Sequence, residues 1–222
     1  MAGDISRIGV AGMNIAILIP TYFRPKGLRR LLQSIKDTSP LVHLVVVAEP
    51  DDRYAALVSR QFGVTFAISL PRRGSGHAWN LALAVAPNFD AYILGADDCY
   101  YLPGWYEAMI KCIEDKGGSG LFGLNDGTGV QHYLMTRDFI IEHNGGVMVM
   151  PHYGGWFQDM EACARARSVG KYYFAFDAKI VHDWHGSATS NYKVEGEKLF
   201  NQRREAGFPD DYPPILEMEF PA

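Results

Sequence analysis

Two adjacent carboxylates, Asp97 and Asp98, directly follow a short apolar run at Ala91–Leu94 and the small residues Gly95 and Ala96. An apolar run of this length is typical of a buried strand. Carboxylates at the exit of a strand lie at the sheet edge where open α/β folds bind their ligands. Neighbouring acids repel each other unless a cation, solvent or a proton neutralises them. The pair therefore predicts a site for a divalent metal ion and a phosphorylated ligand.

The elements that position this pair alternate between strand and helix patterns in the first half of the chain. Continuous apolar runs predict strands at 15–19, 44–48, 64–68 and 91–94. Leucines and isoleucine at i, i+3, i+4 and i+7 predict a helix from Leu28 to Ile35. Asp51 or Asp52 can cap a second helix that runs to about residue 62, and further helices are predicted at 77–85 and 104–116. This order favours an α/β fold with a mostly parallel sheet and right-handed crossovers.

The second half of the chain is less regular. Its patterns predict strands at 121–124, 132–135, 172–176 and 179–181, and helices at 137–143, 159–169 and 195–205. We expect a smaller mixed region here, beside the parallel sheet.

Composition limits the classes of protein that this sequence can encode. Its 222 residues are 48% hydrophobic and 21% charged, which is typical of one globular domain. A formal net charge of −4 makes general nucleic-acid binding a poor fit, and no apolar run approaches the ~18 residues of a membrane span. Cys99, Cys112 and Cys163 form no CxxC pair, so we expect free thiols in a reducing cytosol. We therefore expect a cytoplasmic protein, with peripheral membrane association left open.

Four segments in order carry a resemblance to a known family: Ile17–Pro25 (ILIPTYFRP), the Asp97-Asp98 pair, Trp156–Glu161 (WFQDME) and Ala178–Ser187 (AKIVHDWHGS). Together they resemble the family 2 inverting glycosyltransferases of the GT-A fold over about residues 14–187. The resemblance implies a hexosyltransferase that uses a nucleoside-diphosphate sugar, Mn²⁺ or Mg²⁺, and an acceptor hydroxyl. It also implies a GT-A domain at 13–186, followed by a C-terminal extension at 187–222. Within the domain, 13–104 would bind the donor and 105–186 the acceptor. Residues 1–12 lack periodicity and Met13 directly precedes the first predicted strand, so we expect a tag or disordered leader at 1–12.

The resemblance assigns the nucleoside to loops after the first two strands. Pro20, Thr21 and Tyr22 would line the nucleobase pocket, where a ring offers stacking and a hydroxyl offers hydrogen bonding. Glu49 follows the second strand, where many relatives have an Asp that binds the base or ribose. Glu49 is equally well explained as an ordinary loop acid.

A basic, glycine-containing turn precedes the helix predicted from residue 77. Family members have a similar turn, followed by an Asn on the helix. The resemblance therefore implies donor contacts for Arg73 and Asn80, and more weakly for Arg72, since arginine binds diphosphate well. The alternative is a solvated basic loop.

The acidic pair matches the metal-binding motif of the family. Many relatives have a further acid two positions before Asp97, where this chain has Gly95. The resemblance therefore implies that Asp98 is the direct metal ligand and that Asp97 binds ribose or supports the ligand. His182 would complete the metal site, with His185 as second choice. The alternative for the pair is a helix cap at a turn.

Asp159 follows Gln158, where relatives often have Glu-Asp. An inverting transfer needs a base that deprotonates the acceptor hydroxyl, and the resemblance assigns that role to Asp159. Asp159 could instead cap the helix that follows it. Glu161 is the local competitor, but its position two residues further along a helix would point it elsewhere.

Weaker candidates for the acceptor site are two tryptophans, Trp156 and Trp105, because indole faces stack on sugar rings, and also His185. Both tryptophans could equally be core residues. Two other functions stay open: a non-catalytic module that binds nucleotide or sugar, and a sugar nucleotidyltransferase. The second is disfavoured because Pro20–Arg24 is not a glycine-rich phosphate loop.

Overall fold

The computed structural model describes residues 12–39, 41–71, 73–127, 132–153, 155–183 and 193–211. These ranges contain eight strands: β1 (Ile15–Thr21), β2 (His43–Ala48), β3 (Thr65–Ile68), β4 (Ala91–Leu94), β5 (Cys99–Tyr101), β6 (Leu121–Asn125), β7 (Tyr133–Thr136) and β8 (Tyr172–His182). They also contain seven helices: α1 (Pro25–Thr38), α2 (Arg53–Phe62), α3 (Gly74–Val85), α4 (Trp105–Asp115), α5 (Arg137–His143), α6 (Gln158–Ser168) and α7 (Lys193–Glu205).

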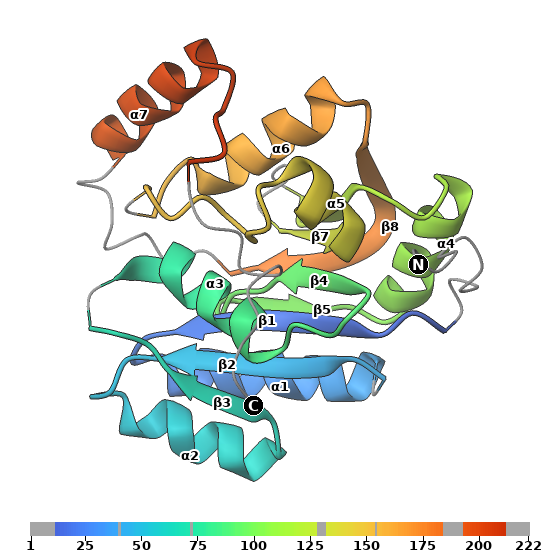
Figure 1. Cartoon of the computed structure of the whole chain (residues 1–222). Helices are drawn as coiled ribbons and strands as arrows, with labels where there is room; N and C mark the ends of the chain where they lie inside the picture. The colour runs from blue at the N-terminus through green and yellow to red at the C-terminus, as the bar shows by residue number, and fades with distance from the viewer. Residues whose placement is uncertain are drawn as a thin grey trace, which may run out of the picture.

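The strands form one sheet in the order β3-β2-β1-β4-β7-β6-β8-β5 (Figure 1). The first four are parallel, as predicted, so the carboxyl ends of β1, β2 and β4 meet at one edge. The strands β7 and β5 run antiparallel to their neighbours, whereas β6 and β8 are parallel to each other. This confirms an α/β fold with a mixed second half.

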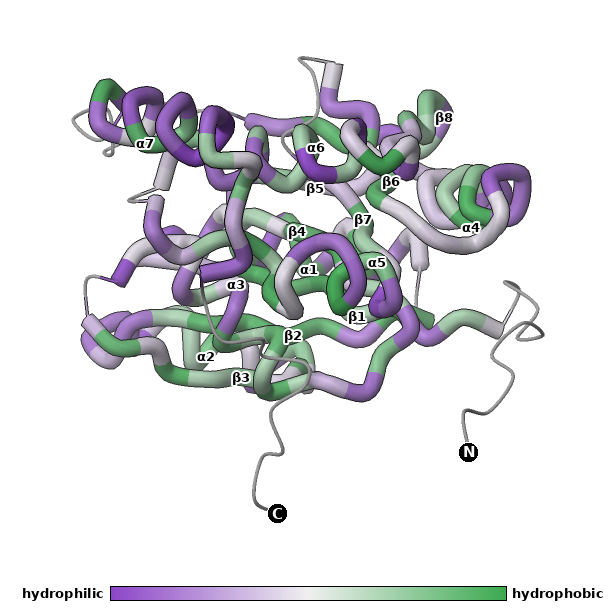
Figure 2. The backbone as a smooth tube through the Cα atoms, turned by 45° about the horizontal axis from the view of Figure 1, so that its top comes forward, coloured by the Kyte–Doolittle hydropathy of each residue, from purple (hydrophilic) through white to green (hydrophobic). Residues whose placement is uncertain are grey.

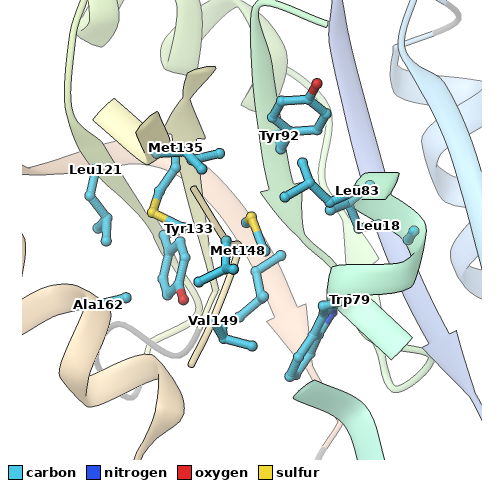
Figure 3. Packing of buried hydrophobic residues seen from close by; sticks show 14 of the residues in the cluster. Leu18, Trp79, Leu83, Tyr92, Leu121, Tyr133, Met135, Met148, Val149 and Ala162 are labelled. Carbon is cyan, nitrogen blue, oxygen red and sulfur yellow. The ribbon is translucent and has the colours of Figure 1, made fainter. Parts of the chain in front are cut away.

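Helices cover both faces of the sheet. On one face, buried residues of α1, α2 and α4 form a cluster with alternate residues of β1, such as Ile17 and Ile19. On the other face, buried residues of α3, α5 and α6 form a second cluster with the intervening residues, such as Leu18. Figure 3 shows this second cluster, where Trp79 of α3 and Tyr133 of β7 lie near the 148–149 segment.

The distribution of hydropathy follows this layered arrangement. Figure 2 shows hydrophobic residues concentrated in the central strands, whereas α7 is largely hydrophilic. Even so, Phe200 of α7 is 8% exposed and belongs to the second cluster, the one that Figure 3 shows. No helix in the described ranges combines the length and apolar character of a membrane span.

Three elements differ from the sequence prediction. The strand β5 was not predicted because three residues show no periodicity; it forms by pairing with β8. The strands predicted at 172–176 and 179–181 are one strand, β8, which has a register shift opposite Leu124 and Asn125. The helix α3 begins at Gly74, one turn before the predicted start.

Candidate active site

The acidic pair lies where β1 and β4 end side by side. Thr21 at the end of β1 donates a hydrogen bond from Oγ1 to Oδ2 of Asp97, at 2.7 Å. Gly27, in the first turn of α1, lies against the backbone of Asp97. A Cβ added to Gly27 would be 2.4 Å from the Asp97 carbonyl oxygen. The close approach of α1 therefore requires glycine at this position.

Arg24 holds the two carboxylates together. Its Nη1 lies 2.9 Å from Oδ2 of Asp98 and 3.4 Å from Oδ1 of Asp97. Arg24 also lines a surface pocket that contains both acids, Lys26, and Arg30 in an ion pair with Asp183 at 2.7 Å. A pocket with these charges suits a ligand with both phosphate groups and a cation.

The strand pairing of β5 with β8 brings the far end of the chain to this site. Cys99 is opposite His182 in the register, and the Asp183 N–H donates to the Asp98 carbonyl at 2.8 Å. His182 Nε2 consequently lies 3.5 Å from Oδ1 of Asp98. The predicted pairing of Asp98 with His182 is thus present in the geometry.

The environment separates the pKa values of the two acids. Burial raises the pKa of Asp97 to about 6, although Thr21 and Arg24 partly oppose it. Burial would also raise the pKa of Asp98, but His182 and Arg24 outweigh it and lower the value to about 2. The hydrogen bond to Asp98 raises the pKa of His182. Asp98 is therefore an ionised carboxylate at neutral pH, as a hard cation requires.

Residues predicted to bind the nucleoside lie around the same sheet edge. Pro20 is within β1, and Tyr22 is 54% exposed. Glu49 lines another pocket, together with Arg53 and Phe66. Asp52 is the helix cap, since its Oδ1 accepts from the Ala55 N–H at 3.0 Å.

Asp52 also fixes the loop that follows Tyr22. Its Oδ2 accepts from the Phe23 N–H at 2.6 Å. Phe23 has φ +52°, a left-handed conformation that is uncommon for a non-glycine residue. The cap of α2 thereby holds the loop that presents Tyr22 and Arg24.

The basic turn and its helix divide into two roles. Arg73 is exposed and directly precedes α3, whereas Arg72 lies outside the described residues. Asn80 is 2% exposed: Oδ1 accepts from the N–H groups of Met148 and Val149, and Nδ2 donates to the Val149 carbonyl. The Asn80 side chain therefore holds the 148–149 backbone, instead of contacting the nucleotide-sugar as predicted.

Asp159 lies in the first turn of α6, as predicted. Burial raises its pKa to about 6, while backbone N–H groups of the helix start partly oppose the shift. The neighbouring Gln158 is 3% exposed and donates from Nε2 to Ser75 Oγ at 3.0 Å. A Cβ on Gly76 would lie 2.5 Å from Gln158 Oε1, so α3 and α6 approach each other closely here.

Glu161 is occupied elsewhere, which confirms the prediction that it points away from Asp159. Its carboxylate accepts from Tyr153 Oη at 2.6 Å, Arg165 Nε at 3.0 Å and Arg203 Nε at 2.8 Å. Arg203 belongs to α7, so this buried cluster joins α7 to α6.

The two tryptophan candidates for the acceptor site have different environments. Trp156 is partly exposed, with Lys193 Nζ 5.5 Å from its ring centroid. Trp105 is wrong as an acceptor residue, because it is fully buried between Tyr101 and Tyr106 and donates to Thr38 Oγ1. His185 lies outside the described residues.

Sequence reasoning missed three residues beside the acidic pair. Arg24 was visible as a cation directly after the first strand. Cys99 and His132 lie next to His182, and the distance from Cys99 Sγ to His132 Nε2 is 3.2 Å. Their separation of 33 positions forms no recognisable motif.

Comparison with solved structures gives relatives of this fold. The mannosyltransferase PcManGT from Pyrobaculum calidifontis, solved with GDP-Man and Mn²⁺, has a TM-score of 0.70 at 14% identity, over 92% of this chain and 67% of that one. The glucosyl-3-phosphoglycerate synthase of Mycobacterium tuberculosis, solved with phosphoglyceric acid, has a TM-score of 0.66 at 13% identity, over 91% and 83%. The alignment with S. aureus TarS 1–349, solved with UDP, covers 73% of this chain and 57% of that one, with a TM-score of 0.59 at 14% identity.

These identities show the fold alone. Comparison with curated proteins gave no match. The sequence of residues 16–163, more than half of the chain, matches glycosyl transferase family 2. This chain therefore belongs to glycosyl transferase family 2 and is a glycosyltransferase with the GT-A fold.

Proposed function

We propose that this chain is a metal-dependent inverting glycosyltransferase that moves a sugar from a nucleoside-diphosphate sugar to an acceptor hydroxyl. The observation that carries the proposal is the contrast between Asp98 and Asp159. Asp98 is ionised beside His182, whereas Asp159 has a pKa of about 6 at the start of a helix. These are the properties needed by a metal ligand and by a general base, respectively.

The donor would lie along the ends of β1, β2 and β4. Arg24 and the neighbouring cations of its pocket complement a diphosphate. The exposed ring of Tyr22 offers a stacking face, and Glu49 offers an acceptor for a base or ribose group. Thr21 and Arg24 both contact the Asp97 carboxylate and fix its orientation. Asp97 would then bind the ribose of the sugar donor or support Asp98 at the metal.

Asp98 and His182 would hold the divalent cation. A bound cation would neutralise the charge that develops on the departing nucleoside diphosphate. The residues fit this role, since an ionised carboxylate oxygen and an imidazole nitrogen lie 3.5 Å apart. An imidazole ligand favours Mn²⁺ over Mg²⁺.

Asp159 would perform the proton transfer. Its carboxylate takes the proton of the acceptor hydroxyl as that oxygen attacks the anomeric carbon. The bond from the anomeric carbon to the diphosphate oxygen breaks, and its electron pair leaves with the nucleoside diphosphate. A base with a pKa near 6 is mostly ionised at neutral pH and can still hold a proton transiently.

The domain plan follows from these assignments. Residues 13–104 would form the donor half, and residues 105–186 the acceptor half with Trp156 near the acceptor. The segment 187–222 is an extension, of which α7 lies on α6 through Arg203 and Glu161.

The base assignment is tested by the Asp159→Asn variant. It should lose sugar transfer by at least about a thousandfold while keeping the thermal stabilisation by nucleotide-sugar. Asp138→Asn is the matched control, because Asp138 is an exposed acid in the first turn of another helix. It should transfer sugar at the normal rate.

Two results would contradict the proposal. Normal transfer by Asp159→Asn would remove Asp159 as the base. Nucleotide-sugar binding by the wild type without any transfer, over a panel of hydroxyl acceptors, would favour the non-catalytic binding module instead.

A further inference from the structure

Three metal-ligating side chains meet behind the acidic pair. Cys99, His132 and His182 place one ligand atom each within 4.8 Å of one another. Cys99 is 1% exposed and His132 is 5% exposed, and the His182 side chain is 9% exposed. One sulfur and two imidazole nitrogens are thus collected in a region with little access to water.

The hydrogen bonds of His132 prepare it as a ligand. Its Nδ1 lies 3.2 Å from the carbonyl oxygen of Leu94. A carbonyl only accepts, so Nδ1 bears the ring proton and the lone pair of Nε2 faces Cys99 Sγ at 3.2 Å. Histidines that bind metals are commonly oriented by this type of bond from the other ring nitrogen to a backbone carbonyl.

The sheet fixes the three positions relative to one another. The β5–β8 register sets Cys99 opposite His182. The backbone carbonyl of His132 accepts from Leu124 N–H at 2.9 Å, which holds His132 to β6. The rings of His132 and His182 are perpendicular, with centroids 4.8 Å apart. Cys99 and His182 therefore lie on two paired strands, and His132 directly precedes β7.

The metal ligands of this cluster differ from those proposed for the catalytic cation. A thiolate with two imidazoles selects Zn²⁺ or a similar borderline ion, whereas Mg²⁺ prefers oxygen. In a tetrahedral zinc site, sulfur and nitrogen ligands lie about 3.6 Å apart, from Zn–S and Zn–N bonds of about 2.3 and 2.05 Å. The Cys99–His132 distance of 3.2 Å requires only a small adjustment, whereas the cluster as a whole, with separations of up to 4.8 Å, must contract by about 1 Å around the ion.

We propose that Cys99, His132 and His182 form a second metal position, selective for Zn²⁺, and that its occupation inhibits the enzyme. Binding replaces the proton on the Cys99 sulfur with a metal–sulfur bond and displaces the proton that His182 holds toward Asp98, and both protons pass to solvent. Asp98 Oδ1 lies 3.9 Å from Cys99 Sγ and 3.5 Å from His182 Nε2, so it is available as the fourth ligand.

Inhibition follows because the two metal positions share His182. Zn²⁺ bound to Cys99 and His132 would also bind His182 and Asp98. These two side chains would then no longer be available to the cation that binds the nucleotide-sugar. This second half of the proposal rests on the proposed function, whereas binding of Zn²⁺ does not.

Cobalt spectroscopy tests the site without an activity measurement. Titration of the metal-free protein with Co²⁺ should produce one equivalent of a tetrahedral complex, with a thiolate-to-cobalt charge-transfer band that Zn²⁺ abolishes. Cys99→Ser should lose the band and His132→Gln should weaken Co²⁺ binding by at least about tenfold. Cys163→Ser is the matched control, since Cys163 is also a buried free thiol, and it should keep the band.

The second measurement is Zn²⁺ inhibition of Mn²⁺-supported transfer, with each variant compared to its own uninhibited rate. The Zn²⁺ concentration for half inhibition should rise at least about tenfold in Cys99→Ser and stay unchanged in Cys163→Ser. A wild type that shows only weak octahedral Co²⁺ absorption, or a Cys99→Ser variant that keeps the charge-transfer band, overturns the site. If the wild type shows the cobalt band but no transfer activity, the proposed function is contradicted, whereas the proposed metal position still stands.

Discussion

Arg24 Nη1 lies 2.9 Å from Oδ2 of Asp98, so an arginine of the first loop neutralises the carboxylate assigned to the metal. The same nitrogen also contacts Asp97. A divalent ion at Asp98 must therefore compete with a cation of the protein itself. Arg24 would be free to turn toward the donor diphosphate once the ion is bound.

This relationship predicts opposite effects of Arg24→Gln on two ligands. Mn²⁺ alone should bind several-fold tighter, because a competing positive charge is removed. The nucleoside diphosphate should bind about ten- to a hundredfold more weakly, because a charged donor is lost. Calorimetric titration measures both affinities. Lys26→Gln is the control, since Lys26 lines the same pocket and is exposed; tighter Mn²⁺ binding in this variant as well would point to general charge instead.

Gly95 predicts that the fuller acidic motif cannot be restored in this chain. A Cβ at Gly95 would lie 2.9 Å from Cγ2 of Ile17 and 3.0 Å from the Leu18 carbonyl oxygen. Gly95→Asp should therefore destabilise the fold rather than add a metal ligand, and Gly95→Ala should cost about 1–3 kcal/mol. Urea denaturation gives the free energy of unfolding. A Gly95→Asp variant with wild-type stability and tighter Mn²⁺ binding would show that the side chain faces the site instead.

Asp159 predicts a conflict between activity and stability. Its pKa is raised from 3.8 to about 6 by burial, so the native state binds the proton more tightly than the unfolded chain does. Protonation of Asp159 therefore stabilises the native state fully below about pH 4, and this contribution to the free energy of unfolding is lost as the pH rises through about 6. Asp159→Asn should therefore be more stable than wild type at pH 8, by about 1–3 kcal/mol.

The difference in the free energy of unfolding between Asp159→Asn and wild type should shrink toward zero near pH 4. Denaturation of both proteins at several pH values measures it. A difference that stays constant from pH 4 to pH 8 would mean that the stability effect does not arise from ionisation of Asp159.

Local sequence patterns predict the elements that form without distant partners. The strands β1, β2, β3 and β4 were predictable from apolar runs, and a cap before α2 from Asp51 or Asp52, between which the structure selects Asp52. The cluster of Cys99, His132 and His182 was not, because it depends on the β5–β8 pairing and on residues far apart in the sequence. The burial of Trp105 was equally hidden, since an indole suits both a core and a sugar site.

Arg203 predicts a structural requirement for α7. The Glu161 carboxylate is 1% exposed and accepts from Arg203 and Arg165. Arg203→Met should destabilise the fold by about 3–5 kcal/mol, because it removes one partner of a buried ion pair. Lys198→Met on the exposed side of the same helix should change stability by less than about 0.5 kcal/mol. Thermal and urea denaturation compare the two; equal stability of both variants would show that α7 is not needed for the fold.

In the proposed mechanism, Asp98 binds a metal ion that in turn holds a nucleoside diphosphate. A thermal-shift panel of nucleoside diphosphates, with and without Mn²⁺, tests it most directly because bound ligand raises the melting temperature. We predict that at least one nucleoside diphosphate stabilises the wild type only in the presence of Mn²⁺, and that Asp98→Asn loses this shift while keeping its fold. Stabilisation of equal size without Mn²⁺, or an undiminished shift in Asp98→Asn, would show that Asp98 does not bind the nucleotide through a metal ion.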